Sequence, residues 1–183
     1  MEIVRELLPG CLLLRGNVFE DARGRFVKTF HADAFAGLGL SFELREEFHS
    51  VSRRGVLRGM HFQVPPHHHA KLVHCSRGAV LDVVVDLRRG PGYGRFASVE
   101  LKEGDGSIVF IPAGLAHGFL ATEDFAEMHY KTGSVHAPDS DRGIGWNGFG
   151  FDWGVTAPLV SPRDAAHPAL ADFDSPFVGE DAS

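Results

Sequence analysis

Short apolar runs fill the middle of the chain, and glycine-rich or acidic turns separate them. Between residues 42 and 131 the runs are rich in residues that favour β-strands, and several alternate apolar and polar positions. The 183-residue chain contains 22 glycines and 10 prolines, which interrupt it too often for a helical bundle. This pattern is typical of a β-sandwich or β-barrel, and it constrains the fold more than any other feature.

Length and composition favour a single domain. With 44% hydrophobic residues, the chain can bury one sizeable core but is too short for two ordinary domains. Residues 31–40 contain the one plausible short helix, with Asp33 as its expected N-cap. We therefore predict one all-β domain over residues 1–183, with short helices and a mobile acidic tail at about 172–183.

The charge and cysteine content exclude some partners and favour one compartment. The formal net charge of −6 argues against nucleic acid, and an anionic ligand then needs a local basic patch. Cys11 and Cys75 are the only cysteines, and no stretch resembles a signal peptide or a membrane span. We predict a cytoplasmic protein that does not bind membranes.

Two stretches carry most of the candidate chemistry. The first, GVLRGMHFQVPPHHHAKLVHCSRG at 55–78, holds five histidines in two apolar runs joined by a Pro-Pro turn. The second, GSIVFIPAGLAH at 106–117, has the glycine, proline and histidine spacing of the second sequence motif of the cupin superfamily. This resemblance implies a small β-barrel of the jelly-roll type.

The first cupin motif is only half present. Gly55, His61 and Gly78 fall where that motif has them, but Gln63 replaces its second histidine and Lys71 replaces its glutamate. A protonated lysine has no lone pair and is a poor neighbour for a divalent metal. We therefore predict a cupin-type jelly-roll barrel whose metal site has been removed.

A closer resemblance covers about residues 15 to 168. The order and spacing of seven strings resemble dTDP-4-dehydrorhamnose 3,5-epimerase and its relatives. The strings are FEDARGRF, GVLRGMHFQ, KLV, VVVDLRRG, IPAGLAHGFL, HYKT and APDSDRGIGWN. The resemblance implies a jelly roll, a homodimer whose active sites are completed by the partner subunit, no cofactor, and a nucleotide-diphosphate-linked 4-keto-6-deoxy sugar as substrate.

The residues suit that chemistry. Inverting a carbon next to a ketone requires a base on one face, a group that stabilises the enolate, and an acid on the opposite face. His61 is the natural base, and the resemblance implies that Asp164 in SPRDAAHP orients it. It also implies that Lys71 stabilises the enolate oxygen and that Tyr130 returns the proton. His117 is expected to bind near the reacting sugar.

Each of these residues also has a purely structural interpretation. A lone histidine on a strand, such as His61, is often a packed or surface residue. Tyr130 can be a core ring, and Lys71 can pair with Asp82 on the neighbouring strand. Asp164 can form a turn or cap a helix.

The arginines are expected to bind phosphate, because guanidinium groups match paired phosphate oxygens. The resemblance places Arg23 and Phe26 at the nucleotide, reaching across from the partner subunit, and Arg58 near the diphosphate. Simple alternation puts Arg58 and His61 on opposite faces of their strand, so this role requires Gly59 to bend the strand.

Some positions that contact the sugar or nucleotide in the family are altered here. Glu46 and Phe48 precede Ser50 where the family has a glutamine and an asparagine, and His136 replaces a tyrosine. We expect these four positions to contribute to substrate binding and the preferred substrate to differ from the standard rhamnose-pathway intermediate.

Two other classes of function stay open. A metal-dependent cupin oxygenase or isomerase would use His61, His117 and one histidine from 67 to 69. Consecutive side chains of an extended segment point to opposite faces, so this run of three is better explained as an exposed loop. The third hypothesis is a sugar-binding module that has lost catalysis.

Overall fold

The computed structural model describes residues 1–178, and strands dominate it. The strands are β1 (Glu2–Leu8), β2 (Cys11–Arg15), β3 (Val18–Asp21), β4 (Gly24–Val27), β5 (Glu46–Ser52), β6 (Leu57–Gln63), β7 (Lys71–Arg77), β8 (Ala79–Asp86), β9 (Phe96–Lys102), β10 (Ser107–Ile111), β11 (Leu115–Ala121), β12 (Ala126–Thr132) and β13 (Asp141–Gly143). The helices are α1 (Ala32–Gly37), α2 (Pro162–Ala165) and the 3₁₀ turn η1 (Leu170–Asp172).

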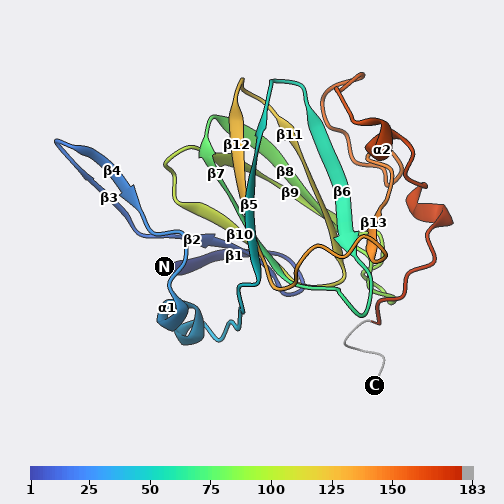
Figure 1. Ribbon diagram of the computed structural model, residues 1–183, viewed down its shortest axis with the longest axis horizontal. Coiled ribbons are helices and arrows are strands. Elements are labelled where there is room, and N and C mark those ends of the chain that lie inside the picture. The colour runs from blue at the N-terminus through green and yellow to red at the C-terminus, as the bar shows by residue number, and fades with distance from the viewer. Residues whose placement is uncertain (179–183) are drawn as a thin grey trace.

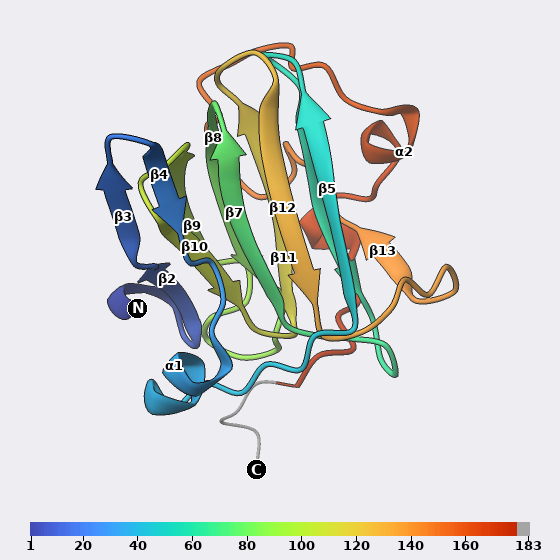
Figure 2. The ribbon, with the colours of Figure 1, turned by 60° about the vertical axis from the view of Figure 1, so that its left-hand side comes forward.

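Two antiparallel sheets pack face to face (Figure 1). One has the strand order β1-β2-β10-β7-β12-β5 and the other β13-β6-β11-β8-β9. Figure 2 shows β7, β12 and β5 side by side in the first sheet. Neighbours in each sheet are mostly distant in sequence, as when β7 pairs with both β10 and β12. This arrangement confirms the predicted all-β jelly-roll fold.

Strand alternation decides which side chains enter the space between the sheets. In β12, Met128 and Tyr130 are buried while the intervening His129 is partly exposed. Because side chains of a strand point alternately to opposite faces, Tyr130 is directed into the barrel. Each fully buried large apolar side chain, such as Met128, contributes roughly 1.5–3 kcal/mol to folding.

The irregular C-terminal part of the chain covers the outer face of the five-stranded sheet. Ile144, Phe149 and Trp153 pack with Val83 and Val85 of β8 in one buried cluster. This cover explains why β8 and β11 are apolar on both faces and do not alternate. The same C-terminal part contains α2, which packs beside β6 (Figure 1).

The short helix lies where the sequence predicts it, but its cap differs. The N-cap is His31, whose Nδ1 accepts a hydrogen bond from the Ala34 N–H at 3.4 Å. Asp33, predicted to be the cap, lies in the first turn, where its negative charge faces the positive end of the helix dipole. The prediction was therefore wrong by two residues.

The described part of the predicted mobile tail is attached to the barrel. The Ser175 hydroxyl donates a hydrogen bond to the Leu87 carbonyl, and Asp174 pairs with Arg89 at 2.7 Å. Phe177 is buried against Phe62, with ring centroids 5.9 Å apart. Residues 179–183 lie outside the described residues, and the single domain stays a prediction.

The β3–β4 hairpin projects away from the barrel (Figure 1). Two of its aromatic rings, Phe19 and Phe26, pack on each other with centroids 6.1 Å apart, yet they stay 53% and 60% exposed. Such exposed aromatic side chains are typical of surfaces that bind a partner. None of the helices within residues 1–178 is long and apolar enough to cross a lipid bilayer.

Candidate active site

A cavity of about 300 Å³ opens between the two sheets, and side chains from both sheets line it. Most of the predicted site residues line this cavity. They are Glu46, Phe48, Ser50, Arg58, His61, Lys71, His117, Tyr130 and His136. The cavity therefore gathers residues that are far apart in the sequence, such as Glu46 and His136, which are 90 positions apart and share a hydrogen bond.

His61 lies at the wall of the cavity with Asp164 behind it. The His61 Nε2 is 2.7 Å from the Asp164 Oδ1, and the Asp164 Oδ2 accepts a hydrogen bond from the Gly59 N–H at 3.3 Å. Burial acts to raise the pKa of Asp164, but the hydrogen bonds from His61, Gly59 and Ser161 outweigh it and lower this pKa. The carboxylate is thus anionic and holds the Nε2 proton, which leaves Nδ1 of His61 to accept another.

The local sequence explains why Asp164 reaches this position. Ser161 is the N-cap of α2, and its hydroxyl accepts a hydrogen bond from the Asp164 N–H at 3.0 Å. Pro162 occupies the first turn, where a missing N–H costs nothing. Asp164 therefore lies in the first turn of α2 and is not its cap, and its carboxylate contacts His61.

An irregularity in β6 brings Arg58 and His61 to the same cavity. Two residues of β6, Gly59 and Met60, stand opposite Gly118 of β11 alone, which makes a bulge. Gly59 has a φ of +142°, and a Cβ there would lie 2.5 Å from the Gly118 Cα. The bend that the sequence prediction required of Gly59 is therefore present.

Lys71 enters the cavity from β7, and no acidic side chain within residues 1–178 forms an ion pair with it. Its Nζ donates a hydrogen bond to the His61 carbonyl at 3.1 Å. Burial lowers the pKa of Lys71 to about 8, although the nearby Asp141 and Asp82 act to raise it. The alternative pairing of Lys71 with Asp82 was wrong, because Asp82 contacts a different residue.

Asp82 contacts His117, whose Nε2 is 2.7 Å from the Asp82 Oδ2 in a fully buried pair. The sequence analysis did not identify Asp82 as a site residue. Its signal was an acidic residue in the middle of the apolar run AVLDVVVDL, since a buried charge is retained only where it has a partner. The pair fixes His117 next to Tyr130, with ring centroids 6.1 Å apart.

Tyr130 faces the cavity from β12, in the sheet opposite His61. Its ring stacks on Phe48 with centroids 4.7 Å apart and an interplanar angle of 14°. Burial raises the pKa of the Tyr130 phenol, so the hydroxyl keeps its proton at neutral pH. The His61 imidazole and the Tyr130 phenol therefore line the cavity from opposite sheets.

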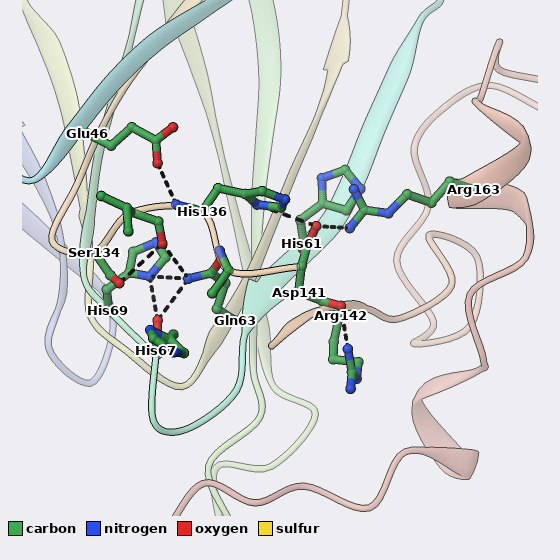
Figure 3. Close-up of polar contacts among 12 residues, drawn as sticks. Glu46, His61, Gln63, His67, His69, Ser134, His136, Asp141, Arg142 and Arg163 are labelled. Atoms are coloured by element: carbon green, nitrogen blue, oxygen red, sulfur yellow. Dashed lines mark hydrogen bonds and ion pairs between the residues drawn. The ribbon is translucent and has the colours of Figure 1, made fainter. Parts of the chain in front are cut away.

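Polar side chains at the cavity rim hold a loop in place (Figure 3). The Glu46 Oε2 accepts a hydrogen bond from the His136 N–H at 2.7 Å, and the Gln63 Oε1 accepts one from the Ala137 N–H at 2.7 Å. Arg163 pairs with Asp141 at 2.7 Å beside His61. Sequence reasoning missed this pair, because no local pattern predicts a contact between two loops.

Arg23 and Phe26 are the predicted binding residues that this chain does not bring to its own cavity. Both belong to the projecting β3–β4 hairpin. The Arg23 side chain is 90% exposed and forms an ion pair with the neighbouring Asp21 at 2.5 Å. The roles of these two residues stay predictions.

Among residues 1–178, one close group of side chains has the ligand types that bind a metal, and it contains His61, Asp164 and His167. It includes neither His117 nor any histidine from 67 to 69, which the metal-dependent hypothesis had combined with His61. His67 and His68 are exposed, as predicted for a loop, but the prediction was wrong for His69, which is partly buried and lines the cavity.

The fold and site match one family. A family model described as dTDP-4-dehydrorhamnose 3,5-epimerase matches residues 5–172. A curated dTDP-4-dehydrorhamnose 3,5-epimerase from Escherichia coli is 40% identical over 169 residues, which cover 90% of this chain and 91% of the relative.

Two solved structures are similar over nearly the whole fold. The first is an epimerase from Legionella pneumophila in complex with dTDP-4-keto-L-rhamnose, with a TM-score of 0.91, 30% identity, and coverage of 97% of this chain and 98% of that one. The second is a 3′-monoepimerase from Streptomyces bikiniensis in complex with dTDP-quinovose, with a TM-score of 0.85, 33% identity, and coverage of 91% and 88%.

These matches confirm the resemblance read from the seven sequence strings and favour an isomerase over a metal-dependent oxygenase or a non-catalytic module. The chain belongs to the dTDP-4-dehydrorhamnose 3,5-epimerase family.

Proposed function

We propose that this chain is a cofactor-independent epimerase that inverts C3, C5 or both in a nucleotide-diphosphate-linked 4-keto-6-deoxy sugar. The observation that supports it is the position of His61 and Tyr130 on facing sheets, with Lys71 lining the cavity between them. Proton removal on one face and proton delivery on the other is what inversion requires.

The side chains of His61, Lys71 and Tyr130 account for every proton and electron pair of the inversion. Nδ1 of His61 takes the proton from the carbon next to the ketone, and the C–H electron pair becomes the C=C bond of an enolate. The former ketone oxygen takes the negative charge, which protonated Lys71 stabilises. The Tyr130 hydroxyl then protonates the carbon from the opposite face, and the C=O bond re-forms.

Incubation in heavy water tests the proposal. A panel of 4-keto-6-deoxy sugar nucleotides is incubated with the enzyme, with and without EDTA, and NMR locates deuterium at C3 and C5. We expect deuterium and inversion with at least one compound, at a rate that EDTA does not change. Binding without exchange would indicate a sugar-binding module, and a rate lost with EDTA and restored by one metal would indicate a metal-dependent enzyme.

The same panel tests the expected change of substrate. Glu46 and Phe48 line the cavity, but the Glu46 carboxylate accepts the His136 N–H and the Phe48 ring stacks on Tyr130. A ligand that needs hydrogen bonds at these two positions loses about 1–3 kcal/mol for each unmatched group. We therefore expect a compound other than dTDP-4-keto-6-deoxyglucose to react best.

Lys71 determines how the rate depends on pH. Because burial lowers its pKa to about 8, kcat/KM is expected to fall about tenfold per pH unit above this value, where the enolate loses its cation. Lys71→Gln has a neutral amide that does not titrate. The variant should react more slowly, but its kcat/KM should not show this alkaline limb, the fall above the pKa of Lys71. If pH profiles of kcat/KM show the same limb in both proteins, another group is responsible.

The enzyme is further proposed to be a cytoplasmic homodimer. The exposed rings of Phe19 and Phe26 support a hairpin that packs on a partner, where Arg23 can reach the nucleotide. The cysteines Cys11 and Cys75 are both unpaired and buried, which agrees with a reducing compartment.

Mixing two inactive variants tests the shared site. If Arg23 serves the partner's cavity, a heterodimer of Arg23→Ala and His61→Asn contains one site with both native residues. Co-refolded mixtures are then expected to recover about a quarter of the wild-type rate, since half of the dimers are mixed and each has one intact site. A rate no higher than the sum of the separate variants would place Arg23 in the cavity of its own chain.

A further inference from the structure

His167 lies behind the catalytic pair and contacts both of its members. Its Nε2 is 3.9 Å from the Asp164 Oδ1, the same oxygen that contacts His61, and its ring meets the His61 ring edge-on with centroids 5.8 Å apart. A Cβ at Gly143 of β13 would lie 2.4 Å from this Nε2, so the glycine makes room for the imidazole. The distance of 3.9 Å is too long for a hydrogen bond.

The His167 Nε2 is buried and has no hydrogen-bond partner within residues 1–178. A neutral imidazole next to an anionic carboxylate and a second imidazole offers two nitrogen ligands and one oxygen ligand to a cation.

The ligand geometry suits zinc. The three ligand atoms of His61, Asp164 and His167 lie within 4.8 Å of one another, with separations from Asp164 of 2.7 and 3.9 Å. Zinc bonds of ~2.0–2.1 Å in a tetrahedron separate the ligand atoms by about 3.3 Å, so shifts of about 1 Å or less complete the site. Two histidines and one carboxylate with an open fourth position form a familiar zinc ligand set.

A metal can reach this position. A second hollow, lined by Leu57, Leu159 and Val160 as well as by His61 and Asp164, opens beside the pair. Two cations line this hollow: Arg163 forms an ion pair with Asp141 (Figure 3), and the Arg58 guanidinium donates hydrogen bonds to the Ser52 hydroxyl and the Val51 carbonyl. This zinc site shares His61 with the cupin motif, but its other two ligands, Asp164 and His167, lie outside the motif.

We propose that His61, Asp164 and His167 bind Zn²⁺ and that the bound metal inhibits the enzyme. Coordination needs the lone pair of the His61 Nε2, so the remaining ring proton moves to Nδ1. The atom that accepts the substrate proton is then already protonated, and the base is lost. The inhibition rests on the proposed role of His61 as the base, whereas the binding does not.

Binding is measured apart from activity. The metal-free protein is titrated with Co²⁺, whose visible absorption bands report tetrahedral coordination, and with Zn²⁺ by equilibrium dialysis. We expect one ion per chain in wild type, and an affinity at least about 10-fold lower in His167→Ala and in His167→Leu, which keeps the apolar volume. His68→Ala, an exposed histidine outside the cluster, is the matched control and should bind as wild type does.

Inhibition is measured on the same proteins by deuterium exchange. Zn²⁺ should stop exchange in wild type and in His68→Ala at concentrations that leave both His167 variants active, and Mg²⁺, which prefers oxygen ligands, should have no effect. Equal zinc affinity in wild type and His167→Ala overturns the site. If zinc binds as expected but metal-free protein exchanges no substrate proton, the site stands and the proposed function fails.

Discussion

His61→Asn is expected to abolish deuterium incorporation at every carbon of the sugar. Asparagine keeps a polar side chain of similar reach but has no group that accepts a proton near neutral pH. General-base catalysis contributes about 10²–10⁴-fold, and His117 is not expected to replace His61, because the His117 Nε2 is held by Asp82. The measurement is the NMR-detected exchange rate at C3 and C5 under single-turnover conditions.

Asp164→Asn is the companion variant and should slow exchange by about 10²-fold or more. The neutral amide removes the negative charge beside His61 and permits the wrong tautomer, although the Ser161 cap and the fold stay in place. Thermal unfolding of both variants is the control for the fold. Exchange at the wild-type rate in His61→Asn would remove that residue from its role.

Tyr130→Phe is expected to separate exchange from inversion. The variant loses the hydroxyl but keeps the ring that stacks on Phe48, so the cavity keeps its shape. His61 still removes the proton from its own face, and solvent deuterium returns to that face. We expect exchange within about tenfold of wild type while inversion falls by about 10²-fold or more.

The control for Tyr130→Phe is Phe48→Leu, which disturbs the stacked pair but leaves the hydroxyl in place. This variant should change exchange and inversion by the same factor. If Tyr130→Phe also slows both equally, the tyrosine positions the substrate and another group delivers the proton.

The site residues that lie on strands could be predicted from the sequence. His61, Lys71 and Tyr130 lie within strands whose apolar runs are visible in the sequence, and each strand holds its side chain at a definite depth in the cavity. Asp164 was also predicted, because the string around it resembles the family, and the structure places it on His61. Their catalytic roles stay predictions until the exchange experiments are done.

Contacts between distant loops were beyond sequence reasoning. Asp82 was considered a possible partner of Lys71 because their strands, β8 and β7, are neighbours in sequence. In the fold, however, β8 pairs with β11, and Asp82 therefore contacts His117. His167 attracted no notice, since one histidine in a loop has no periodic pattern around it. Its position depends on β13 and on the glycine at 143 that makes room for it.

If Asp164 orients His61 as proposed, the enzyme is expected to stay inactive until the C-terminal cover, which carries Asp164, has been synthesised. His61 and Asp164 are 103 residues apart, and the chain leaves the ribosome from its N-terminus. Strands β1 to β12 can therefore pair and enclose Lys71 and Tyr130 while the base still lacks the carboxylate that orients it. During that interval the apolar outer face of β8 is also exposed to solvent. Docking of the C-terminal cover then buries this face and completes the active site in the same step.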